Sequence, residues 1–235
     1  MKRFYTACSA VAVGGQWQVA LDGRKVRTQG GAPQLIPSSA LAEAMVTEWD
    51  TQGEEIDPDG FPLRDLADYA IDVVRPDPGK LAEGLLRFAE TDTLCYRAEP
   101  DTALGIRQRQ VWEPLVSGSE ARIGARFVRI VGVIHRPQPP ETIAALNALM
   151  LEHDAYDLAG LHTLASLAAS LIVGLAALDP QADADALFAA SNLEEDWQAE
   201  FWGQDAAAAE LRARRIATFR EAARFVRLAR ERDAA

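Results

Sequence analysis

The run Pro137-Gln138-Pro139-Pro140 constrains the fold more than any other feature of the chain. Proline lacks a backbone N–H and disfavours helix interiors and central strands, so this run predicts a linker. Before the linker, segments of alternating apolar residues are mixed with segments of helical spacing, whereas after it every segment has helical spacing. We therefore predict an α+β fold, with an N-terminal antiparallel β-sheet domain with helices over residues 1–136. An all-α helical bundle domain is predicted over residues 141–235.

An antiparallel hairpin is predicted near the start of the chain. Trp17–Leu21 alternates with period two, and Asp22 and Gly23 follow it. This dipeptide favours a two-residue turn with positive φ angles, so we assign both residues a structural role. Lys25–Thr28, after this turn, is predicted to be the next strand of the hairpin. Arg122–Ile134 also alternates over part of its length and predicts a further strand.

A helix is predicted after the hairpin, with Ser38 or Ser39 as its N-cap. Leu41, Met45 and Trp49 follow at i, i+4 and i+8, which places them in one stripe. Such a stripe is typical of a core-facing side, so Trp49 is predicted to be a structural core residue.

A second helix, predicted to begin at Ser191 and end before Gly203, is unusually acidic and aromatic. Ser191 is the predicted N-cap, and the Glu194 carboxylate is positioned to complete a capping box. Its two neighbouring stripes contain Leu193, Trp197 and Phe201 in one and Glu194, Gln198 and Trp202 in the other. One interpretation is a bundle helix with a solvated face, in which Trp197 is structural. The other is a recognition helix whose aromatic side chains and carboxylates contact another protein.

The charge and the motifs exclude several functions. The formal net charge is −11, which argues against non-specific nucleic-acid binding because that binding depends on neutralising phosphates. The three histidines and two cysteines occur in no metal-binding spacing, and the chain has no phosphate-loop or nucleophile-elbow motif. We therefore predict no metal, no cofactor and no nucleic-acid partner.

Acidic pairs such as Glu54-Glu55 and Glu194-Glu195 leave one enzymatic alternative open. Two carboxylates can catalyse hydrolysis, although adjacent acids on a helix point in different directions and are frequent in so acidic a chain. The alternative to a binding protein is therefore a small-molecule enzyme that uses acidic residues in a cleft between the domains.

Leu158–Leu178 has no formally charged residue and is long enough to span a bilayer. It also contains polar and small residues, and Asp157 and Asp179 flank it without a positive anchor. We predict a buried central helix of a soluble bundle and no membrane insertion. Met1-Lys2-Arg3 is followed by a strand-like run and not by a secretory signal, so the expected location is cytoplasmic.

Five short stretches, in order along the chain, resemble the ATP12 family, the assembly chaperones of the F1 sector of ATP synthase. They are Arg3-Phe4-Tyr5, Val19-Ala20-Leu21-Asp22-Gly23-Arg24, Glu48-Trp49-Asp50-Thr51-Gln52, Thr91-Asp92-Thr93-Leu94-Cys95-Tyr96-Arg97-Ala98, and Leu193-Glu194-Glu195 with the following Trp197-Gln198 and Trp202-Gly203. The resemblance implies an N-terminal α+β domain and a C-terminal helical domain. It also implies a holdase that binds the free F1 α subunit until the β subunit displaces it, without nucleotide and without catalysis.

The resemblance implies that a carboxylate in the last-but-one helix is important for function. Glu194 matches best and Glu195 second. With the expected aromatic anchor and polar rim, the predicted partner-binding set is Glu194, Glu195, Gln198, Glu200 and Trp202. Family members occur in mitochondria and in α-proteobacteria, so the resemblance implies a bacterial cytoplasmic protein here and a mitochondrial matrix location for eukaryotic relatives.

Overall fold

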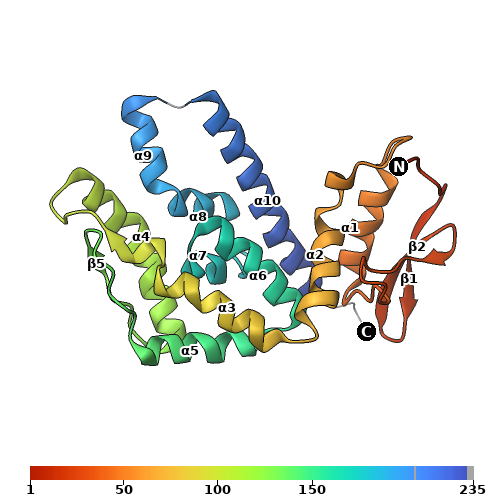
Figure 1. Ribbon diagram of the computed structural model, residues 1–235, viewed down its shortest axis with the longest axis horizontal. Helices are drawn as coiled ribbons and strands as arrows, with labels where there is room; N and C mark the ends of the chain where they lie inside the picture. Colours follow the sequence, from red (N-terminus) through yellow and green to blue (C-terminus); the bar gives the residue numbers. More distant parts are fainter. Residues whose placement is uncertain (204, 232–235) are drawn as a thin grey trace. The chain divides into compact units, whose positions relative to one another are not determined.

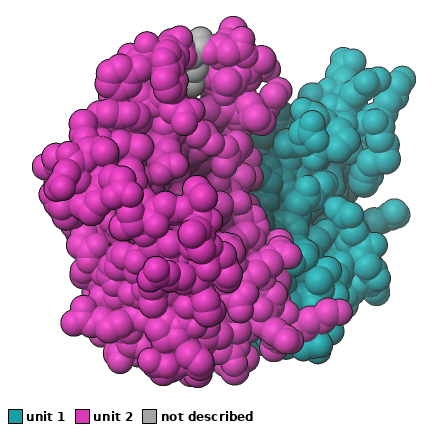
Figure 2. Space-filling model, turned by 60° about the vertical axis from the view of Figure 1, so that its left-hand side comes forward, with its two compact units in different colours: residues 1–78, 154–160, 221–235 teal, residues 79–153, 161–220 magenta. Residues whose placement is uncertain are grey.

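The computed structural model describes residues 1–203 and 205–231, which form two compact units (Figure 2). Unit 1 contains residues 1–78, 154–160 and 221 onward. Unit 2 contains residues 79–153 and 161–220. The chain therefore passes between the units more than once, and some unit limits fall within helices.

Unit 1 contains a three-stranded antiparallel sheet in the order β1-β2-β3. The strands are β1 (Cys8–Val13), β2 (Gln16–Leu21) and β3 (Arg24–Lys25). The φ angles of Asp22 and Gly23 are 46° and 78°, as the two-residue turn requires, so the predicted hairpin is confirmed. The Asp22 carboxylate accepts hydrogen bonds from Thr6 Oγ1 and Ala7 N, both at 2.9 Å. These bonds lower the pKa of Asp22 and fix the turn to the segment before β1.

Helix α1 (Ser39–Asp50) packs against β1 and β2 (Figure 1). Ser38 is its N-cap, since Ser38 Oγ accepts a hydrogen bond from Leu41 N at 3.1 Å. The predicted stripe is confirmed: Leu41 and Met45 are fully buried and Trp49 is 7% exposed. The α1 helix is followed by a 3₁₀ turn (Pro58–Gly60), α2 (Pro62–Tyr69) and a π-helical turn (Ala70–Val74).

A buried carboxylate of α1 holds the start of α2. Glu48 Oε1 accepts a hydrogen bond from Leu63 N at 2.7 Å, and Glu48 Oε2 accepts one from Arg64 N at 3.0 Å. These are amides of the first turn, which have no partner within their own helix. Burial, with a smaller contribution from the nearby Glu221, raises the pKa of Glu48 to about 7, although the two hydrogen bonds and the Arg64 charge act to lower it.

This carboxylate predicts a pH-dependent stability. The folded protein keeps a proton on Glu48 in the range from pH 4.5 to about 7, where the unfolded chain has released it. Stability therefore falls as pH rises through this range. Glu48→Gln keeps one acceptor oxygen but cannot ionise. Urea unfolding at pH 5 and at pH 7.5 measures how much unfolding free energy is lost between the two pH values. We expect this loss to be smaller for the variant than for the parent, by on the order of 1–3 kcal/mol. Equal losses would mean that Glu48 is ionised throughout the range.

Helices make up most of unit 2, and the core includes the buried side chains of Trp112, Leu146, Phe188 and Phe219. The elements after α2 are α3 (Pro78–Glu90), a 3₁₀ turn (Thr93–Cys95), β4 (Tyr96–Arg97), α4 (Ala103–Ile123), β5 (Ile130–Val131), α5 (Pro140–Leu151), α6 (Ala155–Ala168), α7 (Leu171–Ala176), α8 (Ala184–Ser191), α9 (Leu193–Trp202) and α10 (Ala206–Arg230). Helix α4 packs against α5, α7 and α9. The predicted α+β class, with an N-terminal antiparallel sheet followed by helices, is confirmed.

The strand predicted at Arg122–Ile134 is mostly wrong. Its start belongs to α4, and only Ile130–Val131 pairs, in parallel, with β4. The backbone between them bonds to side chains instead: Phe127 N donates to Glu120 Oε1 at 2.8 Å, and Val128 N donates to Gln138 Oε1 at 2.8 Å. Such bonds replace strand pairing, which residue alternation alone does not reveal.

The two compact units do not divide at the predicted boundary between residues 136 and 141. Unit 2 already begins at residue 79, and its helix α4 packs against α5, α7 and α9. The limits 1–136 and 141–235 of the predicted domains are not those of the compact units, and the division into these two domains stays a prediction.

The prediction of one central helix over Leu158–Leu178 is wrong: the stretch forms the end of α6 and all of α7, separated by Ala169, which has a φ of 46°, and Ser170. Its glycines allow close packing: a Cβ on Gly160 would overlap Val226, and one on Gly174 would lie 3.0 Å from Leu161 Cδ1. Over the described residues, no helix has both the length and the apolar character needed to cross a membrane.

Candidate protein-binding surface

Helix α9 begins directly after α8, with Asn192 between them. Asn192 Nδ2 donates hydrogen bonds to Phe188 O at 2.8 Å and Ser191 Oγ at 3.0 Å. Ser191 is the last residue of α8, and its hydroxyl donates to Phe188 O at 2.8 Å. The prediction of Ser191 as the N-cap of α9 is therefore wrong, because the preceding helix already uses its hydroxyl.

Two acids of α9 are held by α4. Glu194 Oε1 accepts a hydrogen bond of 2.5 Å from the fully buried Gln108, whose own oxygen accepts one from Ala98 N at 2.7 Å. Glu200 Oε2 accepts one from Arg107 Nη1 at 2.7 Å, and this bond lowers the pKa of Glu200. Glu194 thus anchors α9 to α4, in place of the predicted capping box.

The other two acids of α9 face α10. Arg212 Nη2 donates to Asp196 Oδ2 at 2.8 Å, whereas burial raises the pKa of Asp196 against this pairing. Glu195 is held less closely, with its Oε2 atom 4.0 Å from Arg215 Nη1 and its side chain 67% exposed. Of the four acids, Glu195 combines a long ion pair with high exposure, which leaves it accessible to a partner.

A hollow of about 310 Å³ lies between α9 and the start of α10. The α9 residues that line it are Glu195, Asp196, Gln198, Ala199 and Trp202. Three members of the predicted partner-binding set are therefore brought together: an acid, an amide and an indole. The other two, Glu194 and Glu200, are directed to α4 and do not line the hollow.

The C-terminal turn of α9 exposes two large aromatic side chains. Trp202 is 81% exposed and Phe201 is 64% exposed. Trp197 is half-buried, with its ring 5.1 Å from that of Phe201 and 5.5 Å from the Arg107 guanidinium. Sequence periodicity placed Phe201 in the apolar stripe with Leu193 and so assigned it no contact role. Its position in the last turn before Gly203, beyond the packed part of the stripe, is the signal that could have identified it.

This arrangement of side chains is suited to binding another protein. It offers carboxylate and amide acceptors beside flat apolar rings, the combination found at protein interfaces. Over residues 1–203 and 205–231, no group of three His, Cys, Asp or Glu side chains is placed to hold a metal ion. The exposed end of α9, comprising Glu195, Gln198, Phe201 and Trp202, is therefore a candidate protein-binding surface, and we call it the α9 surface.

Comparison with known proteins places this α+β protein in a class of chaperones. A family model described as ATP12 chaperone protein matches residues 2–120. The mitochondrial protein atp12 of Schizosaccharomyces pombe is 25% identical over 214 residues, which cover 86% of this chain and 74% of that protein.

Solved structures extend the similarity over nearly the whole chain. The Atp12 crystal structure from Paracoccus denitrificans is 37% identical, with a TM-score of 0.91 over 97% of this chain and 98% of that one; an Asp-to-Lys variant of that protein matches equally. A protein from Agrobacterium tumefaciens is 38% identical, with a TM-score of 0.90 over 96% of this chain and 85% of that one. The chain belongs to the ATP12 family, chaperones of ATP synthase assembly.

Proposed function

We propose that the protein binds the unassembled α subunit of the F1 sector and holds it until the β subunit displaces it, without converting a substrate. The observation that carries this proposal is the α9 surface, where an indole that is 81% exposed lies beside an accessible acid in a member of an assembly-chaperone family. The bacterial sources of the matched structures support a bacterial cytoplasmic location.

An unassembled subunit exposes apolar interface that other copies can bind in the wrong geometry. A chaperone that covers this interface lowers the concentration of the free, aggregation-prone subunit by mass action. It must also be displaced, so its affinity has to be lower than that of the final partner. A small surface with one exposed aromatic anchor and a few acceptors, such as Trp202 with Glu195 and Gln198, meets both requirements.

We assign the acids of α9 different roles in this proposal. Glu195 contacts the client, because it is accessible and only weakly paired. Glu194 and Glu200 orient the helix, because each is hydrogen-bonded to α4. In this proposal, an acid that does not line the hollow affects binding through the orientation of α9.

Light scattering of the purified F1 α subunit tests the function directly. We expect equimolar chaperone to suppress aggregation of the α subunit, and added β subunit to release the chaperone on a sizing column. Aggregation that proceeds at the same rate with and without the chaperone would contradict the proposal. So would a complex that β subunit does not displace.

A pair of Glu194 variants tests whether this residue orients α9. Glu194→Gln keeps an acceptor for Gln108 and removes only the charge, so we expect unchanged affinity for the α subunit. Glu194→Lys places a donor opposite the Gln108 amide and leaves a buried polar group unsatisfied, which costs about 1–3 kcal/mol. We expect its client affinity to fall about tenfold or more with the bulk of the fold retained. Equal loss in both variants would show instead that the Glu194 charge contacts the client.

A further inference from the structure

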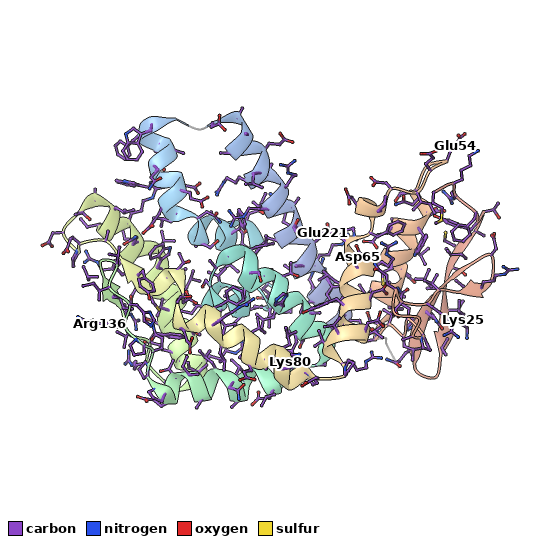
Figure 3. All side chains as sticks on the ribbon, viewed as in Figure 1. Lys25, Glu54, Asp65, Lys80, Arg136 and Glu221 are labelled. Carbon is purple, nitrogen blue, oxygen red and sulfur yellow. The ribbon has the colours of Figure 1, made fainter. Side chains whose placement is uncertain are left out.

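Unit 1 contains a cavity of about 550 Å³ beside the β2–β3 hairpin, and its lining shares no residue with the α9 surface. Its lining combines two kinds of side chain. Aromatic rings come from Phe4, Tyr5 and Trp49, and positive charges come from Arg24, Lys25 and Arg27. Figure 3 labels Lys25 beside the sheet. The combination is unexpected in a chain with a net charge of −11.

The positive charges of this cavity are only partly used within the described residues, where Arg24 helps to lower the pKa of the Asp22 carboxylate. Arg24 and Lys25 form no hydrogen bond and no ion pair there through their side chains, and Arg27 donates to the Gly31 carbonyl at 2.7 Å but to no carboxylate. The Asp22 carboxylate also lines the cavity, yet it is directed to Thr6 and Ala7 by three backbone and hydroxyl donors. Three cations therefore remain available to an anionic ligand.

The aromatic residues of the cavity also have groups that the described residues leave without a partner or exposed. Tyr5 and Trp49 are buried, and the Trp49 indole N–H donates to no acceptor among the described residues. Phe4 is 63% exposed and packs edge-on against Tyr5, with ring centroids 5.3 Å apart. A solvent-exposed phenyl ring beside unpaired cations offers an apolar contact next to an electrostatic one.

We propose that this cavity binds an extended acidic segment of a partner protein, with carboxylates on Arg24, Lys25 and Arg27 and an apolar residue against Phe4. A polypeptide is the ligand because the chain belongs to a chaperone family, and because Arg24 and Lys25 in β3 and Arg27 beyond its end offer separate cations to successive carboxylates. The proposal does not depend on which ATP synthase subunit the α9 surface binds.

Amide NMR titrations of the full chain test the ligand class. The probe is the peptide acetyl-Glu-Glu-Phe-Glu-Glu-amide, and the comparison peptide has Gln in place of every Glu. We expect the acidic peptide to shift the amides of residues 24–27 and to bind about tenfold or more tightly than the Gln peptide, with weakening at higher salt. Equal binding of both peptides would overturn the proposal. So would inorganic phosphate that competes at the same concentration, since the site would then accept any small anion.

Charge-reversal variants test the location. Arg24→Glu with Lys25→Glu should weaken the acidic peptide about tenfold or more. The control is Arg109→Glu with Arg136→Glu, which makes the same change in net charge at exposed side chains of unit 2; Figure 3 labels Arg136. We expect the control to change affinity less than about twofold. Thermal melts of both variants should match the parent. Equal weakening by both pairs would show that only the net charge matters and would overturn the assignment.

Discussion

Trp49→Arg is expected to unfold unit 1 at room temperature. Trp49 is 7% exposed and lies between the rings of Tyr5, at 5.5 Å, and Phe61, at 4.5 Å. Replacing a buried aromatic side chain costs about 3–5 kcal/mol from lost packing alone. The guanidinium would also be buried without a carboxylate, beside Arg64, which already lies 5.7 Å from the Trp49 ring. Breaking charge balance in a protein interior adds a further loss of about 3–5 kcal/mol.

The sum of these two losses reaches the whole stability of a typical domain, about 5–15 kcal/mol. Circular dichroism and urea unfolding measure it. Trp49→Phe is the matched control: it keeps an aromatic ring against Tyr5 and Phe61, and it removes the indole N–H that has no acceptor, so we expect a loss of only about 1–2 kcal/mol. A Trp49→Arg protein that melts like the parent would show that this side chain faces solvent.

Trp202→Ala is expected to remove most of the affinity for the client and to leave the fold intact. The indole is 81% exposed, so its removal costs little stability. As an aromatic anchor at the centre of a small interface, it should contribute about 2 kcal/mol or more to binding, which is a roughly 30-fold loss of affinity. Light scattering of the α subunit and titration calorimetry measure the loss.

Ile134→Ala is the control for this result. Ile134 is an exposed apolar residue in unit 2 that follows β5 and does not line the α9 hollow. Its truncation should leave both client affinity and melting temperature unchanged. If the two variants suppress aggregation equally well, the client does not use Trp202, and the α9 surface loses its main support.

Local sequence patterns predicted the elements whose interactions are close in the chain. The Asp22-Gly23 turn forms because only a few residue types accept two successive positive φ angles. The stripe of Leu41, Met45 and Trp49 is buried because helical spacing places these residues on one side, whatever that side packs against. Both rules act within about ten residues.

The candidate site was predicted only in part. Periodicity placed Gln198 and Trp202 on one stripe, and the structure has both lining one hollow. It also placed Glu194 on that stripe, yet Gln108 from a helix 86 residues earlier determines where the Glu194 carboxylate points. Ser191 differs from its prediction for a local reason, because its hydroxyl donates to Phe188 O within α8. Side-chain hydrogen bonds select among partners that are distant in sequence, and spacing contains no information about them.

The sequence by itself therefore determined the fold class, the hairpin, the core face of α1 and the family, because these follow from short-range backbone preferences and ordered motifs. The tertiary structure decided which acids of α9 are held and which are accessible, where the strand near β5 shortens, and how the chain divides into two units. The roles of the α9 acids depend on contacts such as Gln108–Glu194, whose two residues are 86 positions apart in the chain. Such contacts form only after distant segments have packed. A polar group loses its hydrogen bonds to water when it is buried, so its partner is a group that the fold has brought next to it.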